Sequence, residues 1–256
     1  MNGAADFGLL AAPLAVGLLV LATHVPLGIA VLRRGIFFID LAVAQVATLG
    51  VLAAGIAHLD GYLGGIATQL AAGLAALAAA ALLTWTERRW PELQEALIGL
   101  LFVLAASAGI LMLAGNPHGG ERLRDLLAGQ ILWVGWNEVA MVALLYAGLG
   151  AAWHLLPARL VRRRGAFYVA FSIAVTASVQ LVGVYLVFAS LIAPAVASVR
   201  VGGRRRTAVA FATGSACYVA GLLLSLLVDV PAAGTIVVIL VIAACAGLPG
   251  TSRRSS

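Results

Sequence analysis

The sequence predicts an all-α protein, a polytopic transmembrane helical bundle of eight to nine spans. Hydrophobic residues occupy 63% of the 256 positions and charged residues only 10%, whereas soluble domains carry about 25% charged residues. Apolar stretches recur along the whole chain, and each approaches or exceeds the roughly 20 residues that a helix needs to cross a bilayer. This pattern leaves no room for a soluble domain, so residues 1–256 are expected to form a single transmembrane domain.

The apolar stretches define the individual spans. The first begins after an N-terminus without basic residues and is too long for the core of a signal peptide, so we expect a retained span. Seven stretches fit one crossing each: Leu9 to Leu32, Ile36 to Ala57, Tyr62 to Trp85, Ala96 to Leu113, Val139 to Leu156, Ala208 to Val228 and Ala232 to Leu248. A longer stretch runs from Ala166 to Val199.

The arginines predict the orientation of these spans. All 16 basic residues are arginine, and 14 of them lie in short segments that the positive-inside rule places in the cytoplasm. These are Arg33 and Arg34, Arg88 and Arg89, Arg159 with Arg162 to Arg164, Arg200 with Arg204 to Arg206, and Arg253 with Arg254. The N-terminus is therefore expected outside and the C-terminus in the cytoplasm. The net charge of +6 then reflects topology, and we expect no nucleic-acid partner.

The same rule requires the stretch from Ala166 to Val199 to begin and end in the cytoplasm. Its 34 residues must therefore turn round, as one full helix and a shorter, broken one. Gly183 and Pro194 are the expected breaks, because proline removes a helix hydrogen bond and glycine tolerates bends. Irregular backbone at depth is typical of a translocation path, although an ordinary kinked packing helix fits the pattern equally well.

Asp40 is the strongest candidate for a functional residue. It lies inside an apolar stretch, where an ionisable group is costly and indicates function. It contacts a transported ion, or it caps the start of a helix, where aspartate binds free backbone N–H groups. Gln45 is the second candidate, although five residues on an ideal helix displace it by about 140° from Asp40.

Catalytic chemistry is not expected. The sequence has no H-E-x-x-H and no G-x-S-x-G motif. It also has no lysine, so it lacks a P-loop, and any ATP that drives transport is hydrolysed by another chain. We expect no cofactor bound by this chain. His58 and Asp60, in an outer segment, are weaker candidates for metal capture because two residues make only a partial ligand set.

Five segments carry a more specific pattern: RRGIFFIDLAVAQVATLGV from Arg33 to Val51, EALIG from Glu95 to Gly99, LAGQILWVGW from Leu127 to Trp136, GVYLVFASLIAPA from Gly183 to Ala195, and DVPAAGTIVV from Asp229 to Val238. In this order and spacing, the chain resembles the permease subunits of the metal-uptake ABC transporter family, the ABC-3 family. The resemblance runs almost from end to end.

This resemblance implies a permease for zinc, manganese or iron in the cytoplasmic membrane of a prokaryote. It implies a homodimeric pore, a cytoplasmic ABC ATPase and an extracytoplasmic metal-binding protein as partners. Arg159 and Arg162 to Arg164 fall where such permeases contact the ATPase, and the connection from Asn116 to Trp136 is a candidate docking surface for the binding protein.

The aspartate of the family pattern corresponds to Asp40, but the histidine that many members carry four residues later is replaced by Ala44. A carboxylate with the amide of Gln45 makes a harder ligand set than a carboxylate with imidazole. This disfavours zinc and leaves manganese or iron open.

Two other transport functions fit the sequence. In a secondary transporter, Asp40 would be the proton or cation site, but such folds often have matching broken helices in both halves, and the first half shows no such break. An ABC permease for a metal chelate, such as a siderophore, is the other alternative. An intramembrane enzyme would need clustered ionisable residues at depth, which the spans do not supply.

Overall fold

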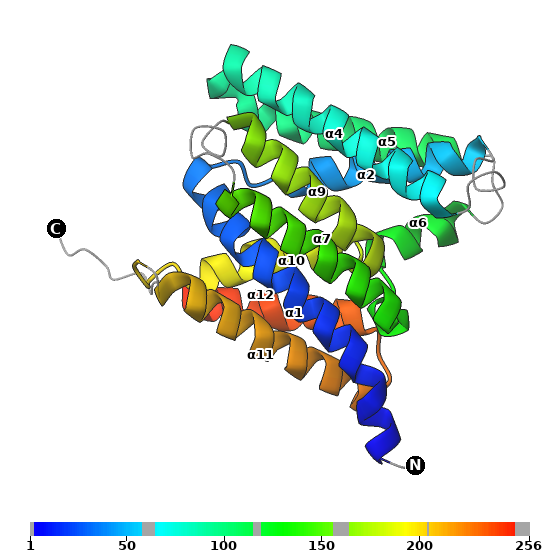
Figure 1. Ribbon diagram of the computed structural model, residues 1–256, viewed down its shortest axis with the longest axis vertical. Coiled ribbons are helices and arrows are strands. Elements are labelled where there is room, and N and C mark those ends of the chain that lie inside the picture. Colours follow the sequence, from blue (N-terminus) through cyan, green and yellow to red (C-terminus); the bar gives the residue numbers. More distant parts are fainter. Residues whose placement is uncertain (1–2, 58–64, 115–118, 156–163, 204, 249–256) are drawn as a thin grey trace.

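The computed structural model describes residues 3–57, 65–114, 119–155, 164–203 and 205–248, and within these ranges the fold is all-α, as predicted (Figure 1). The elements are α1 (Gly3–Arg34), α2 (Ile39–Ile56), α4 (Gly65–Arg89), η1 (Pro91–Leu93), α5 (Gln94–Leu113), α6 (Gly119–Ala128), η2 (Ile131–Trp133), α7 (Trp136–Leu155), α9 (Arg164–Val182), α10 (Val184–Ala197), α11 (Arg205–Val228) and α12 (Ala232–Gly247).

Six of the described helical segments are long and apolar enough to cross a membrane. They comprise α1, α2, α4, α5 together with η1, α9 and α11. Helices α10 and α12 are apolar but have only 14 and 16 residues, and α7 has 20 residues. The count of eight to nine spans therefore stays a prediction, which requires α7, α10 and α12 to cross as well.

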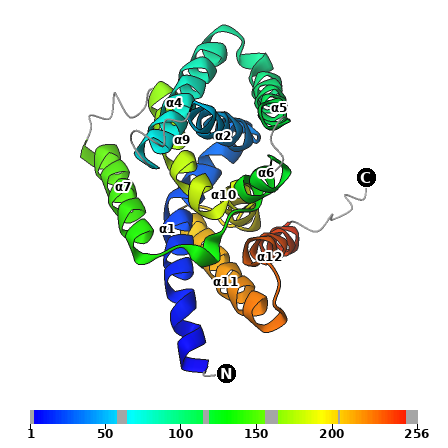
Figure 2. The ribbon, with the colours of Figure 1, turned by 90° about the vertical axis from the view of Figure 1, so that its right-hand side faces the viewer.

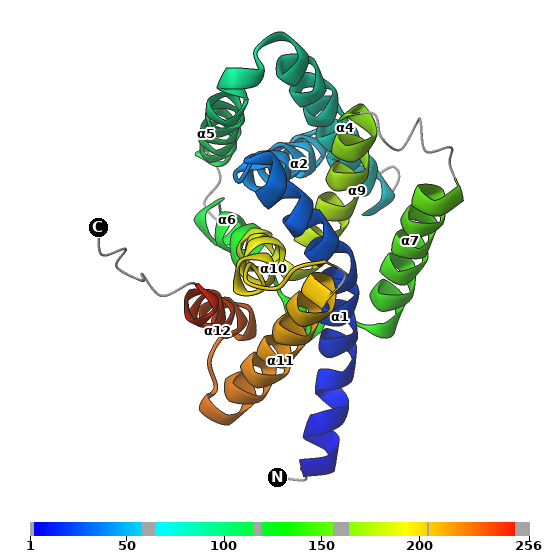
Figure 3. The same ribbon diagram turned by 90° about the vertical axis from the view of Figure 1, so that its left-hand side faces the viewer.

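Helix α2 occupies the interior of one half of the bundle. It packs against α4, α5, α9 and α10, while α10 in turn packs against α1, α11 and α12 (Figure 2). Helix α7 lies at the side of the bundle, where its helix neighbours are α1 and α9 (Figure 3). More than half of α2 is buried within the chain, although it is a membrane span.

Small residues allow these helices to approach closely. A Cβ added at Gly28 of α1 would collide with the backbone carbonyl of Leu191 in α10, and one added at Gly50 of α2 would lie 2.5 Å from the carbonyl oxygen of Ala71 in α4. Close backbone approach at small residues is a major source of helix association in membranes, where apolar side chains gain little by leaving lipid.

The described arginines gather mainly at one end of the bundle, which we call the arginine end. It contains the C-terminal ends of α1, α4, α10 and α12 and the N-terminal ends of α9 and α11 (left side of Figure 1). Seven arginines with described side chains belong to it: Arg33, Arg34, Arg88, Arg89, Arg200, Arg205 and Arg206. The opposite end carries the acidic residues Glu121, Asp125 and Asp229, with Arg124 among them.

The stretch from Ala166 to Val199 is divided at Gly183. Helix α9 ends at Val182 and α10 begins at Val184, with Gly183 at φ 82° and ψ 161° between them. Gly183 lies against Gly129, whose φ is also positive at 69°, so the break touches the segment between α6 and η2. Pro194, in contrast, lies inside α10 and does not divide it, because it falls in the last turn and Ser198 N–H still donates to the Pro194 carbonyl oxygen (3.2 Å).

Replacing Gly183 by alanine is expected to destabilise the fold. A residue other than glycine rarely adopts this φ and ψ, and the added Cβ would also meet the Gly129 backbone. We expect a loss of at least about 2 kcal/mol, or roughly 4 °C or more in the melting temperature of the purified protein.

Gly73→Ala is the matched control, because Gly73 lies inside α4 and a Cβ there meets nothing within 4 Å. This variant should melt at the same or a slightly higher temperature. Equal melting temperatures for Gly183→Ala and Gly73→Ala would contradict the strain argument.

Candidate translocation site

Asp40 is a buried carboxylate near the start of α2. It is the second residue of the helix and is 1% exposed. Neither of its carboxylate oxygens has a hydrogen-bond partner among the described residues. Burying an unpaired charge is very costly, so a carboxylate in this environment requires a cation or a proton. The arrangement therefore fits an ion-contacting residue.

The N-terminus of α2 is held by a different carboxylate. The N-cap residue is Phe38, and its side chain makes no capping hydrogen bond. Instead, the Phe38 backbone N–H donates to Oε1 of Glu95 in the first turn of α5, at 3.2 Å. Glu95 thus accepts from the N-cap residue itself, as the glutamate of a capping box does, but from another helix. Asp40 lies in the first turn of α2, as the helix-start interpretation expects, where a negative charge favours the positive end of the helix dipole. It makes no capping hydrogen bond to the described residues.

The same end of α5 is fixed by Gln94. Its Nε2 donates to the Leu83 carbonyl oxygen of α4 at 3.1 Å and to the Tyr168 hydroxyl of α9 at 3.2 Å. Its Oε1 accepts a hydrogen bond from the Thr86 hydroxyl at 2.9 Å. These buried bonds tie α4, α5 and α9 together, and all three helices pack against α2.

Neither Glu95 nor Gln94 was predicted to have a role. The available signal was two adjacent polar residues at the start of an apolar span, the second of which begins the EALIG segment. Their partners lie 57 and 74 residues away in the chain, at Phe38 and Tyr168, so local spacing could not reveal the contacts.

Gln45 is also buried, at 7% exposure, on the same helix. Helix α2 runs without a break from Ile39 to Ile56, so no distortion brings Gln45 onto the face of Asp40. The described residues contain no group of three or more His, Cys, Asp or Glu that could hold a metal ion together. Within the described part of the chain, Asp40 is therefore an isolated carboxylate.

Several predicted site residues lie outside the described residues. These are His58 and Asp60, proposed for metal capture, and Arg159, Arg162 and Arg163, proposed for contact with the ATPase. Arg164 begins α9, but its side chain is not among those described. Gly183 marks the break between α9 and α10, and its role as a gate stays a prediction.

These features define a multi-pass helical membrane protein with a buried carboxylate near the start of α2 that has no partner among the described residues. A family model described as the ABC 3 transport family matches residues 6–161 and 157–248 of the chain. The chain therefore belongs to the ABC 3 transport family, and the family resemblance of the sequence is confirmed. No curated protein matches the chain.

Two solved structures have a similar fold. One is PsaBC from Streptococcus pneumoniae in complex with Fab, with 19% identity, a TM-score of 0.72, and coverage of 93% of this chain and 90% of that chain. The other is described as an inward-facing conformation of a transporter assigned to the metal-chelate ABC type, with 13% identity and a TM-score of 0.50 over 92% of this chain and 77% of that chain. At these identities, the matches establish the fold alone.

Stability measurements can distinguish the structural roles of Glu95 and Asp40. Glu95→Ala removes the acceptor for Phe38 N–H and should cost about 1 kcal/mol of unfolding free energy, as loss of a helix cap does. Asp40→Asn removes a buried charge without breaking any hydrogen bond in the described structure, so it should leave the stability unchanged or raise it.

The exposed Glu92, in the short turn before α5, provides the control, because Glu92→Ala should change stability by less than about 0.5 kcal/mol. Melting of the purified variants would measure all three effects. A larger loss for Asp40→Asn than for Glu95→Ala would mean that Asp40 is the residue that holds the helix end.

Proposed function

We propose that this chain is the permease subunit of an ATP-binding-cassette importer for a divalent transition metal ion. The observation that supports it most is the isolated, fully buried carboxylate of Asp40 in a membrane span of a protein from an ABC transport family. Since Glu95 occupies the capping position, Asp40 is available to a passing cation.

One solved structure with a similar fold supports a metal in the substrate. It is described as a metal-chelate type ABC transporter, and the chain covers 77% of it. A metal chelate is therefore the alternative substrate to a free divalent ion. In our proposal, the carboxylate of Asp40 attracts the ion, and Gln45, on another face of α2, is the weaker candidate ligand. Oxygen ligands favour manganese or iron over zinc.

The arginine end is proposed to face the cytoplasm of a prokaryotic cell, with the N-terminus of the chain outside. The positive-inside rule supports this orientation, because most of the arginines lie at that end. Asp40 then lies near the cytoplasmic face, since it is the second residue of α2 and follows directly after the turn that begins at Arg34, the end of α1.

The partner ATPase is proposed to dock at the arginine end. Arg159 and Arg162 to Arg164 remain candidates for this surface, and the described residues 198–203 and 205–206 add to it. Arg206 donates to the Ala195 carbonyl oxygen at the end of α10 (3.1 Å), and Arg200 donates to the Leu248 carbonyl oxygen after α12. A movement imposed on this turn would therefore reach α10, which begins at the Gly183 break.

The opposite end is proposed to receive the extracytoplasmic metal-binding protein. Its described part comprises α6 and η2, with Glu121, Asp125 and the exposed Trp133. A second copy of the chain is proposed to complete the pore, because one protomer supplies only a single carboxylate at Asp40, and a homodimer would supply two.

Deleting the gene tests the transport proposal directly. We expect cells without it to accumulate less of at least one of zinc, manganese and iron when that metal is limiting, as measured by elemental analysis. The affected metal would also identify the substrate. Unchanged uptake of all three, each under its own limitation, would overturn the proposal.

Asp40→Asn should lower metal uptake by at least about ten-fold, because a neutral amide cannot replace the charge of the carboxylate. Assembly with the ATPase should stay intact, since the side chain makes no hydrogen bond in the described structure. Uptake of the radioactive metal ion and co-purification of the ATPase would measure the two properties separately.

Ser172→Ala is the matched control. Ser172 of α9 is buried, and its hydroxyl, like the Asp40 carboxylate, has no hydrogen-bond partner among the described residues, but it carries no charge. It should transport like the unmodified protein. Full uptake by Asp40→Asn would eliminate Asp40 as the ion-contacting residue.

A further inference from the structure

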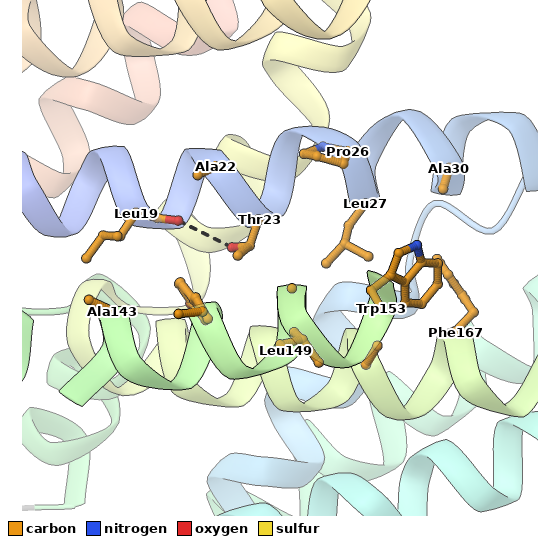
Figure 4. A pocket seen from close by; sticks show the side chains of 14 residues that line it. Leu19, Ala22, Thr23, Pro26, Leu27, Ala30, Ala143, Leu149, Trp153 and Phe167 are labelled. Carbon is orange, nitrogen blue, oxygen red and sulfur yellow. Dashed lines mark hydrogen bonds between the residues drawn. The ribbon is translucent and has the colours of Figure 1, made fainter. Parts of the chain in front are cut away.

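A groove lies between α1, α7 and α9, away from Asp40, and has a volume of about 670 Å³ (Figure 4). We call it the α1–α7 groove. Its lining is almost entirely apolar and includes Leu19, Leu27, Ala143, Leu149, Trp153 and Phe167. The volume is in the range of sites that hold an organic ligand.

The few polar groups in the groove already have partners. The Thr23 hydroxyl donates to the Val20 carbonyl oxygen at 3.0 Å, within its own helix. The Tyr146 hydroxyl is 2.5 Å from Oγ of Ser178 and donates to the Ala174 carbonyl oxygen at 3.2 Å. A polar solute would therefore gain few hydrogen bonds from these groups. A hydrocarbon chain would leave none of them without a partner.

The length of the groove corresponds to one leaflet of a bilayer. Along α1 it extends from Leu19 to Ala30, which is about 17 Å at 1.5 Å per residue. Half of the roughly 30 Å hydrocarbon layer is about 15 Å. The groove runs toward the arginine end, so it lies in the leaflet on that side.

Charge is present where the head group of a lipid in that leaflet would lie. The guanidinium Cζ of Arg34 is 3.9 Å from the centroid of the Phe167 ring, and Phe167 lines the groove. Trp153 and Phe167 lie close together at the same end of the groove in Figure 4. The ring contact holds the guanidinium in place, and its remaining donors suit a phosphate group.

We propose that the α1–α7 groove binds one anionic phospholipid. An acyl chain fills the space between α1 and α7, and Arg34 binds the phosphate. The lipid completes the packing of α7, whose helix neighbours in the described structure are α1 and α9. This proposal does not rest on the transported substrate, and its test requires no transport.

Fluorescence of Trp153 can test it. In a variant whose other four tryptophans are replaced by phenylalanine, Trp153 is the only tryptophan and lines the groove. After reconstitution in vesicles, brominated phosphatidylglycerol should quench it at about five-fold lower mole fraction than brominated phosphatidylcholine, as one basic residue near the surface of anionic lipid predicts.

Two matched pairs of variants sharpen the test. A Cβ at either Gly150 or Gly148 of α7 meets nothing within 4 Å, but only Gly150 lines the groove. Gly150→Leu should therefore lower the quenching at least two-fold, and Gly148→Leu should not. Arg34→Gln should abolish the preference for phosphatidylglycerol, whereas Arg33→Gln, at the neighbouring exposed arginine, should keep most of it.

Equal quenching by both lipids, unchanged in Gly150→Leu and Arg34→Gln, would overturn the proposal. A second copy of the chain bound in the groove would also overturn the proposal. In a background with Cys217 and Cys245 replaced by alanine, efficient disulfide crosslinking of Gly150→Cys between two copies, together with shielding of Trp153 from both lipids, would show that outcome.

Discussion

The hydrogen bond from the Phe38 backbone N–H to Glu95 is the interaction on which the rest of the candidate site depends. A helix that starts within a membrane protein has N–H groups without partners, and a nearby carboxylate is the usual acceptor. In α2, the nearest carboxylate along the chain is Asp40, yet the acceptor comes from α5. Neither oxygen of Asp40 has a hydrogen-bond partner among the described residues. The two carboxylates at the start of α2 therefore differ: Glu95 bonds the N-cap residue, and Asp40 is buried without a hydrogen bond in the described structure.

The arrangement around α2 makes this division possible. Gln94 ties the start of α5 to α4 and α9, so Glu95 is held at a fixed distance from the Phe38 backbone. Close contact at Gly50 brings α4 against α2 from another side. The position of Glu95 therefore depends on packing among four helices. Loss of any one of these contacts would leave the Phe38 N–H without its Glu95 acceptor. Asp40 would then be the nearest carboxylate along the chain.

The helices and their order were predictable because apolar length and arginine placement are strong, local signals. The burial of Asp40 and the break at Gly183 followed from single residues whose chemistry is unusual in an apolar stretch. The cap by Glu95 was not predictable, because its partner is 57 residues away and polar residues at span ends usually face water. Pro194 was predicted to break its helix, but α10 continues past it to Ala197. Whether proline interrupts a helix depends on its position within the helix, and Pro194 lies in the last turn.

The Gly183 break and helix α10 link the two ends of the molecule, and the proposed transport cycle requires such a link. At one side, Gly183 lies against Gly129, next to the segment proposed to receive the binding protein. At the other, α10 ends at the turn whose arginines bind the Ala195 and Leu248 carbonyl oxygens. Coupling between distant sites needs an element with two arrangements that both sites bias. Helix α10, with 14 residues, has a glycine at its start and a turn anchored by arginines at its end, so it contacts both ends of the described structure. Since α10 also packs against α2, a shift of α10 would change the surroundings of Asp40.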